Sequence, residues 1–218
     1  MLDIQAASAV TSAVATSDGF SIVTAVGKPQ RMLFSVGHSN KTIDHFVDLL
    51  RAQAVDVVID VRSHPYSRFA PHFNREPLKE TLARSGMRYG FLGRELGGRP
   101  AGDEYYDDEG HVLYGRVAQT PLFLSGIDRL ESGLEQFRLA MMCSEEDPTD
   151  CHRRLLVARV LEECGIAVVH LRGDRTLQSD SALGGVAQGD IFNGFEEKAW
   201  RSTRSASHRS PPVSSSSY

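Results

Sequence analysis

The stretch FRLAMMCSEEDPTDCHRRLLVARVLEE, residues 137–163, decides the fold of this chain. Its first seven residues form a mainly apolar run that ends at Cys143, which predicts a buried strand. An acidic loop follows, and Cys151–Glu163 then predicts a helix because apolar residues recur on one of its faces. The residues of that face, all expected in the core, are Val157, Val160, Leu161 and Cys164.

The same alternation of strand and helix recurs on both sides of this stretch. Apolar runs predict further strands at residues 32–36, 55–61, 89–92 and 166–171. Helices are predicted over about residues 43–50, 74–85 and 121–135. Thr42 and Asn74 are placed to cap the first two of these helices. Because strands that alternate with helices form right-handed βαβ units, we predict an α/β fold, a three-layer Rossmann-like sandwich with a mainly parallel sheet of about five strands.

The alternation spans one domain with an extension at each end. We predict a single α/β domain over residues 31–178 and an N-terminal extension, partly disordered, over residues 1–30. Within that extension, residues 20–26 are the only candidate for a short added strand. Residues 179–218 are rich in serine and are predicted to be a mostly disordered tail, in which residues 190–192 and Trp200 are candidates for a docked, ordered piece.

Composition narrows the class of protein. Lys plus Arg (24) nearly balance Asp plus Glu (28), so the net charge of -4 gives no global argument for binding nucleic acid or an anionic membrane. Three cysteines do not make a disulfide framework and suit a reducing compartment. No run approaches the roughly 18 apolar residues of a membrane span, and no secretory signal is evident. We therefore predict a cytoplasmic protein without a membrane partner; no feature specifies its oligomeric state.

The predicted strand ends place a candidate site. Ligands of parallel sheets bind outside the carboxyl ends of the strands, and polar or ionisable residues follow all five predicted strands here. The candidates for substrate binding are His38, Asn40, Arg62, Ser63, Ser67 and Arg153. The candidates for a catalytic role are Asp60, Cys143, Glu145 and Cys151.

Two interpretations of the charged candidates remain open. Asp60 and Arg62 could form a structural salt bridge, or Arg62 could clamp an anionic group, because its guanidinium fork suits a carboxylate or phosphate. A carboxylate held beside buried strand ends could have a raised pKa and act as an acid or base, which makes Glu145 and Asp60 candidates. His38 and Asn40 could contact a ligand or stabilise the turn after the first strand.

The two cysteines of the opening stretch have three interpretations. Cys151 at a helix N-terminus would have a depressed pKa and could be a nucleophile, as could Cys143 at the strand end. Both could instead fill the core. The third interpretation is a metal site with His152, but the spacing matches no common zinc motif, and adjacent residues on a helix diverge by about 100 degrees. We therefore predict no metal.

Five segments, taken in order, resemble the family described as domain of unknown function 488. They are VGHSN (36–40), DVRSHPYSRF (60–69), FN (73–74), LGRELGG (92–98) and CSEEDPTDCHR (143–153). The resemblance covers about residues 32–174 and implies a soluble α/β domain, without an activity to carry over. The N-terminal extension lies outside the family pattern.

The leading functional hypothesis is an enzyme, a hydrolase or transferase, that acts on a nucleotide, nucleoside or nucleic-acid-derived substrate. In it Arg62 and Arg153 bind an anion, and the long polar section at residues 93–119 forms a lid. No dinucleotide fingerprint and no P-loop is present, so no cofactor is predicted. Aromatic residues on which a base could stack are Tyr66, Phe69, Phe73, Tyr89, Tyr105 and Tyr106.

Two alternatives accompany this hypothesis. The first is a non-catalytic module that binds a small ligand or associates with nucleic acid through the basic tail around Trp200, Arg201, Arg204 and Arg209. The second is a rhodanese-like thiol enzyme, suggested by Asp60-Val61-Arg62 after a β-branched strand. Against the second, the acids and proline after Cys143 would repel a bound anion and remove an N–H donor.

Overall fold

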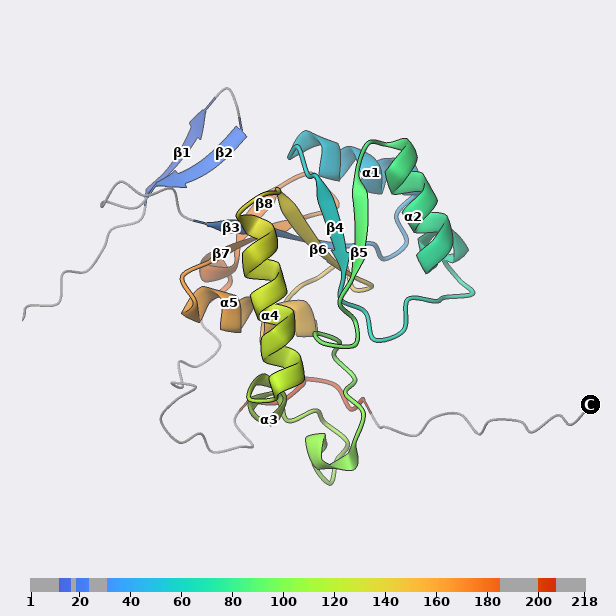
Figure 1. The fold of residues 1–218 in the computed structure, drawn as a ribbon, viewed down its shortest axis with the longest axis vertical. Helices are drawn as coiled ribbons and strands as arrows, with labels where there is room; N and C mark the ends of the chain where they lie inside the picture. The colour runs from blue at the N-terminus through green and yellow to red at the C-terminus, as the bar shows by residue number, and fades with distance from the viewer. Residues whose placement is uncertain (1–11, 17–18, 24–30, 185–199, 207–218) are drawn as a thin grey trace, which may run out of the picture.

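The computed structural model describes residues 12–16, 19–23, 31–184 and 200–206. A six-stranded sheet forms its centre (Figure 1). Its strands are β3 (Met32–Gly37), β4 (Val57–Asp60), β5 (Arg88–Phe91), β6 (Leu139–Cys143), β7 (Ala167–Leu171) and β8 (Leu177–Ser179). The predicted residues 190–192 lie outside the described parts of the chain.

The sheet is parallel except at one edge. Its strand order is β5-β4-β6-β3-β7-β8, and only β8 runs antiparallel to its neighbour. β8 is an additional strand, formed where the chain turns back after Arg172 and pairs with β7. A separate antiparallel hairpin joins β1 (Ser12–Thr16) to β2 (Gly19–Val23), so β2 covers part of the stretch where a short added strand was expected.

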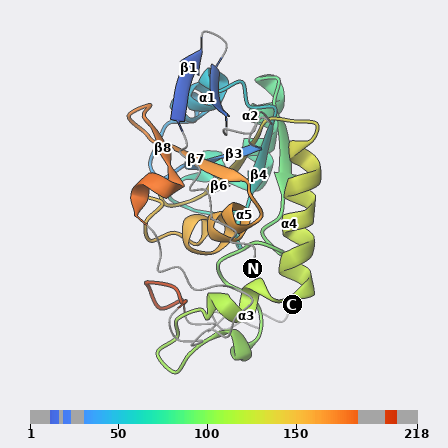
Figure 2. The same cartoon turned by 90° about the vertical axis from the view of Figure 1, so that its left-hand side faces the viewer.

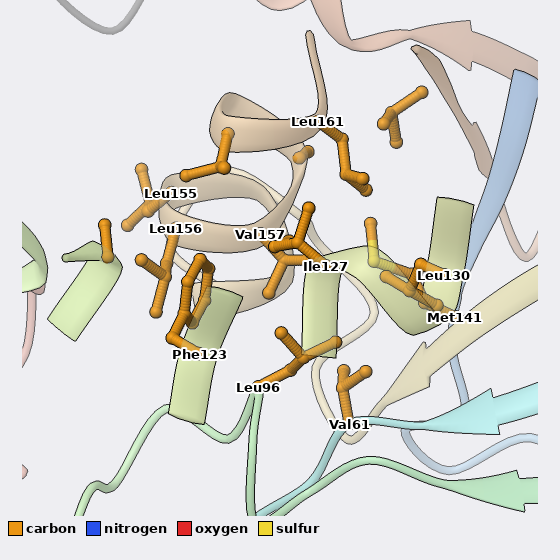
Figure 3. Close-up of a cluster of buried hydrophobic side chains, with 14 of the residues drawn as sticks. Val61, Leu96, Phe123, Ile127, Leu130, Met141, Leu155, Leu156, Val157 and Leu161 are labelled. Atoms are coloured by element: carbon orange, nitrogen blue, oxygen red, sulfur yellow. The ribbon is translucent and has the colours of Figure 1, made fainter. Parts of the chain in front are cut away.

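Helices cover both faces of the sheet, which confirms the three-layer α/β fold. One face packs against α1 (Ile43–Ala52) and α2 (Arg75–Arg84) through residues such as Phe46 and Leu82. The other face packs against α3 (Tyr114–Ala118), α4 (Pro121–Leu134) and α5 (Arg159–Glu163). Figure 3 shows the core on this second face, where Phe123, Ile127 and Leu130 of α4 pack near apolar side chains of residues 155–161. The labelled ones are Leu155, Leu156, Val157 and Leu161.

Two of the helix starts follow from local capping chemistry. Thr42 caps α1 as predicted, its hydroxyl accepting from the His45 N–H at 3.3 Å, and Thr120 caps α4 in the same way. Asn74 also lies at the N-cap of α2, but its side chain makes no capping bond. Its Oδ1 instead accepts from the Ser67 N–H at 2.6 Å, because the preceding loop folds back over the helix start.

The predicted helix over residues 151–163 is not a uniform α-helix. Arg153–Ala158 forms a π-helical turn, labelled η3, and α5 follows it directly. Every residue of η3 is buried, including Arg153 and Arg154. Burial is therefore not limited to the one apolar face that α-helical spacing predicts. Such turns are wound more loosely than an α-helix and are frequent at functional sites. Cys164 is the C-cap of α5 and is exposed. The expectation that it lies in the core is therefore wrong.

The chain order makes β6 a switch point of the sheet. The chain leaves β3 and β4 through helices on one face, whereas it leaves β6 through η3 and α5 on the other. β6 lies between β3 and β4. The connection that follows β6 therefore crosses the opposite face of the sheet from the connections that follow its two neighbours. Open α/β sheets bind ligands at such positions, outside the carboxyl ends of the strands.

The long polar section after β5 is a packed structure rather than an open loop. It contains a 3-10 turn, η2 (Asp103–Tyr105), and α3, and its Leu96 and Val112 are fully buried. In both views this section lies below the sheet together with the red segment, residues 200–206 (Figures 1 and 2). The two are joined by a β-bridge between Leu113 and Arg201.

Trp200 anchors the segment 200–206 to the domain. Its side chain is 2% exposed and its indole N–H donates to the Leu155 carbonyl at 2.7 Å. The Arg159 guanidinium lies 4.2 Å from the ring centroid, and Arg201 forms ion pairs with Asp107 and Glu109. The expected docking of Trp200 is thereby observed. Within the described residues, no helix has the length and apolar character needed to cross a membrane.

We predict that Trp200→Ala lowers the free energy of unfolding by about 3–5 kcal/mol, because it leaves a cavity and an unsatisfied carbonyl in the core. Urea denaturation measures the change. The control is Glu80→Ala, which removes one partner of the exposed pair with Arg84 and should cost less than about 0.5 kcal/mol. Equal effects of the two substitutions would contradict the anchoring role.

Candidate active site

A cavity of about 390 Å³ opens at the carboxyl end of β6. Three separate parts of the chain close around it: the end of β4, the section after β5, and the segment 200–206. The lining residues are Arg62, Ser63, His64, Tyr66, Gly98, Arg99, Tyr114, Cys143, Ser144, Glu145, Asp150, Cys151, His152, Ser202, Arg204, Ser205 and Ala206. The cavity thus lies at the switch point that the topology defines.

Two thiols, an imidazole and a carboxylate converge on one wall of this cavity. The Sγ atoms of Cys143 and Cys151 lie 2.8 and 3.1 Å from the Glu145 Oε2 atom, to which both thiols donate. The same sulfur atoms lie 3.7 and 3.9 Å from Nδ1 of His152. Both cysteines are buried and unpaired by any disulfide. The strand end and the start of the following helix therefore build one cluster.

The loop between the two cysteines is folded by a buried arginine. Arg153 is 1% exposed, and its Nη1 and Nη2 groups donate to the carbonyls of Glu145 and Glu146 at 2.6 and 2.7 Å. Its Nε group donates to Ser35 Oγ on β3. Gly37 permits the close approach of this loop, because a Cβ atom there would lie 1.7 Å from the Glu145 carbonyl oxygen. Arg153 is therefore a support for the loop, and it does not line the cavity.

The three consecutive acids of this loop differ in their shortest contacts. Glu145 faces the thiols. Glu146 accepts from the Arg172 guanidinium and the Gly173 N–H at 2.8 Å each, which ties the loop to the end of β7. Asp147 accepts from the backbone and hydroxyl of Thr149, closing a local turn. Only Glu145 is thus available for chemistry in the cavity.

The environment makes the two thiols unequal. Burial raises the pKa of Cys143, and the adjacent Cys151 adds to that shift. Burial acts in the same direction on Cys151, but a hydrogen bond from Cys143 and the charge of Arg153 bring the pKa of Cys151 well below its ordinary value. Cys151 is therefore the first of the pair to ionise, with Cys143 as a proton donor to it.

His152 is oriented by its second ring nitrogen. Nε2 lies 3.0 Å from the Val61 carbonyl, which can only accept, so Nε2 carries a proton, and in the neutral ring Nδ1 presents a lone pair to the sulfur atoms. Burial lowers the pKa of His152, but the adjacent Cys151 and Glu145 outweigh it and raise that pKa above its ordinary value. Gly98 packs on the ring, where a Cβ atom would lie 2.6 Å from the ring's Cγ. The expectation that Cys151 and His152 diverge is wrong, because both precede η3 and lie in the turn that follows Pro148.

Asp60 and Arg62 form a fully buried salt bridge behind the cavity. Arg62 Nε and Nη2 donate to the two oxygens of Asp60 at 2.9 and 2.6 Å, and Nη2 also donates to the Phe73 carbonyl. The Tyr89 hydroxyl donates to Asp60 at 2.8 Å. Because Asp60 has no exposed surface, this arrangement favours the structural interpretation of the carboxylate over an acid or base role.

His38 belongs to the same buried network. Arg62 Nη1 lies 3.1 Å from His38 Nε2, while Nδ1 donates to the Ser39 carbonyl, so the ring is neutral. Burial and the Arg62 charge lower the pKa of His38 to about 4. The His38 ring stacks on the Phe73 ring, with 4.4 Å between the two ring centroids. Four of the five Arg62 N–H groups are used in these contacts, and Arg62 also lines the cavity.

The remaining predicted residues are divided between the cavity and the loops. Ser63 lines the cavity, and its hydroxyl accepts from the Arg99 N–H at 2.9 Å. Ser67 stabilises its own loop by accepting from Phe69 and Ala70, and Asn40 is exposed at the turn after β3; neither lines the cavity. Of the candidate aromatic residues only Tyr66 reaches the cavity.

Several cavity residues were not anticipated. Tyr114 and the residues from 98–99 and 202–206 come from sections predicted as a lid and a disordered tail, so no strand-end rule could place them. Burial raises the pKa of Tyr114, and the nearby Cys151 and Cys143 add to it, so its hydroxyl stays protonated at neutral pH. A second cluster, Asp107, Glu109 and His111, lies elsewhere, and its carboxylates bind Arg201.

Fold and site together define a three-layer α/β protein with a thiol-, imidazole- and carboxylate-bearing cavity at a switch point of its sheet. The family model described as domain of unknown function DUF488 matches residues 42–160, more than half of the chain. The chain belongs to this family. Neither a curated protein nor a solved structure matches it significantly.

We predict that Asp60→Ala lowers the free energy of unfolding by about 3–5 kcal/mol, because it leaves the Arg62 charge buried without its partner. Tyr89→Phe removes only one hydrogen bond from the same carboxylate and should cost about 1 kcal/mol. Urea denaturation at neutral pH compares the two. A small effect of Asp60→Ala would show that the pair is hydrated and open to a ligand.

The low pKa of His38 predicts a pH dependence of stability. In the unfolded chain this residue takes up a proton near pH 6.5, whereas in the folded chain it does so only near pH 4. The folded state should therefore lose up to about 3 kcal/mol as the pH falls through this window, and none above it. The difference in unfolding free energy between the wild type and His38→Gln, measured from pH 7.5 to 4, isolates this contribution. A difference that does not vary with pH would contradict the neutral ring.

Proposed function

We propose that this protein is an enzyme, a hydrolase or transferase, that acts on an anionic, nucleotide-like small molecule in the cavity at the end of β6. The observation that carries the proposal is the convergence of Cys143, Cys151, His152 and Glu145 on a wall of a cavity large enough for a small ligand. Buried thiols and an oriented imidazole beside a carboxylate are the groups that group-transfer chemistry uses.

The charge around the cavity supports an anionic substrate. Arg99 and Arg204 are exposed at its border, and Arg62 also lines it. The Arg204 guanidinium lies 3.8 Å from the carboxylate of Asp150, another lining residue, in an exposed pair that a stronger anionic ligand can replace. Guanidinium groups bind phosphate and carboxylate in a two-pronged manner, which favours a phosphate-bearing molecule over a neutral one. Tyr66, which is 65% exposed at the border, offers a ring on which a base can stack.

The geometry supports a chemical role for each of these groups. Glu145 is the most exposed member of the cluster, and it is placed to exchange protons between the thiols and a molecule in the cavity. Tyr114 adds a protonated hydroxyl next to the thiols, suited to stabilise negative charge that develops on a substrate. Asp60, Arg62 and His38 hold the back of the cavity rigid.

The loop after Cys143 supports this reaction class over a rhodanese-like one. That chemistry requires backbone N–H groups that cradle an anion around the thiol, whereas here a carboxylate oxygen lies 2.8 Å from Sγ. The proposal also places the protein in the cytoplasm, because two buried thiols in contact with the same carboxylate need a reducing compartment to stay free.

We predict that nucleoside phosphates raise the thermal midpoint of the wild type, and that Arg99→Ala and Arg204→Ala each weaken binding about tenfold through loss of one charged contact. A thermal-shift screen of nucleotides, nucleosides and simple anions, followed by calorimetric titration, measures this. The control is Arg84→Ala, which removes an exposed guanidinium on α2, outside the cavity lining. If no compound binds, or if Arg84→Ala weakens binding equally, the proposal is wrong.

Turnover is tested separately by mass spectrometry of the bound compounds after incubation. Glu145→Gln should keep binding within about threefold and lower the rate at least about a hundredfold, the usual contribution of a positioned acid or base. Binding that persists without turnover by the wild type would instead support the non-catalytic ligand-binding module. Single-stranded oligonucleotides in the same screen test a nucleic-acid partner.

A further inference from the structure

We propose that Cys143, Cys151 and His152 form a binding site for one thiophilic divalent cation, of which zinc is the expected example. The ligands are the two Sγ atoms and Nδ1 of the imidazole, and the fourth coordination position faces the cavity. The inference goes beyond the proposed function, since a cation could be held here whatever the substrate is.

The positions of the three atoms match the geometry of a tetrahedral site. A sulfur and a nitrogen ligand of tetrahedral zinc lie about 3.6 Å apart, given bonds of about 2.3 and 2.0–2.1 Å. The two sulfur-to-nitrogen separations here are 3.7 and 3.9 Å. All three ligand atoms lie within 4.8 Å of one another. The two sulfur-to-nitrogen separations therefore lie within a few tenths of an ångström of those in a tetrahedral site.

The His152 ring is oriented as in a metal-binding histidine. Its Nε2–H donates to the Val61 carbonyl at 3.0 Å, which fixes the tautomer with the lone pair on Nδ1. Metal-binding histidines characteristically donate their other N–H group to a carbonyl or carboxylate. Gly98 packs on the ring from the cavity side, and a larger residue there would displace it.

The charges of the cluster also suit a soft dication. Two thiolates and one dication sum to zero, so a bound cation would offset the charge that two buried thiolates alone would place in this wall. Sulfur and imidazole ligands select zinc-like ions over magnesium or calcium, which prefer oxygen. Both thiols lie within hydrogen-bonding distance of Glu145, and cation binding must release the protons that the thiols still carry.

Glu145 is placed next to the fourth coordination position. An oxygen atom that served as the fourth ligand of a tetrahedral cation would lie about 3.6 Å from each sulfur. Oε2 of Glu145 lies closer than that to both sulfurs, at 2.8 and 3.1 Å. It therefore accepts thiol protons rather than occupying a ligand position. Three protein ligands and an open position facing a cavity are the arrangement of catalytic rather than structural zinc sites.

Cobalt(II) and zinc(II) titrations of the full-length, chelator-treated and reduced protein test the site. We expect one ion per chain, a thiolate-to-cobalt charge-transfer band and the intense visible bands of tetrahedral cobalt. Zinc should raise the thermal midpoint, and calorimetry in buffers of different ionisation enthalpy should detect proton release. Cys143→Ser, Cys151→Ser and His152→Ala should each weaken binding more than about a hundredfold, beyond the loss typical of outer-shell partners.

The matched control is Cys164→Ser, which removes the exposed third cysteine and should leave affinity and spectrum unchanged. Glu145→Gln should keep the thiolate-to-cobalt band, since Glu145 is not a ligand. Circular dichroism of each variant distinguishes the loss of a ligand from the loss of folding. Competition with a chromophoric chelator measures the affinity of the wild type and of each variant. The proposal is overturned if the wild type binds no cation, if Cys164→Ser removes binding, or if the cobalt spectrum lacks thiolate character.

The failures of the two proposals are distinguishable. Cation binding without any effect of nucleotides or anions would keep the site and remove the proposed substrate. Nucleotide binding and turnover by protein that takes up no cation would keep the proposed function and remove the site. Rapid formation of a disulfide between Cys143 and Cys151, with no cation bound under reducing conditions, would show a redox pair in place of a metal site.

Discussion

The candidate site depends on the buried guanidinium of Arg153. It bridges β3, through Ser35, to two consecutive carbonyls of the loop that follows β6, and so folds that loop back over the end of the sheet. With the loop held in this way, Cys143 at the strand end and Cys151 before η3 reach the same carboxylate. A charged side chain that is 1% exposed is stable only because every one of these partners is present.

A second buried network lies next to the cavity, which its Arg62 lines. Asp60, Arg62 and His38 connect the ends of β4 and β3, and Tyr89 of β5 closes the network on the carboxylate. Two hydrogen-bonded networks thus support the residues that line the cavity, one behind Arg62 and one behind the thiols and Glu145. Networks of this kind hold catalytic groups in place without a cost of reorganisation when a ligand arrives.

The fold could be predicted from the sequence to a large extent, because strands and helices of a parallel α/β sheet are signalled locally. The run at Val57-Val58-Ile59 and the cap at Thr42 each encode their element through nearby residues. The site was predicted in part: Cys143, Glu145, Cys151, Arg62 and Ser63 do border one cavity. Asn40 and Ser67 do not, and Arg153 supports the loop instead of facing a ligand.

What sequence alone determined is the α/β class, the positions of its main elements and the edge of the sheet at which the polar residues gather. Only the tertiary structure decided which of these residues meet. The turn that follows Pro148 places His152 beside both thiols, and residues 98–99, Tyr114 and 202–206 join the cavity from sections without periodic signals. The physical reason is that periodicity encodes how a segment contacts the core, whereas a site is made by non-local contacts between loops, whose geometry is fixed by hydrogen bonds such as those of Arg153 and Trp200.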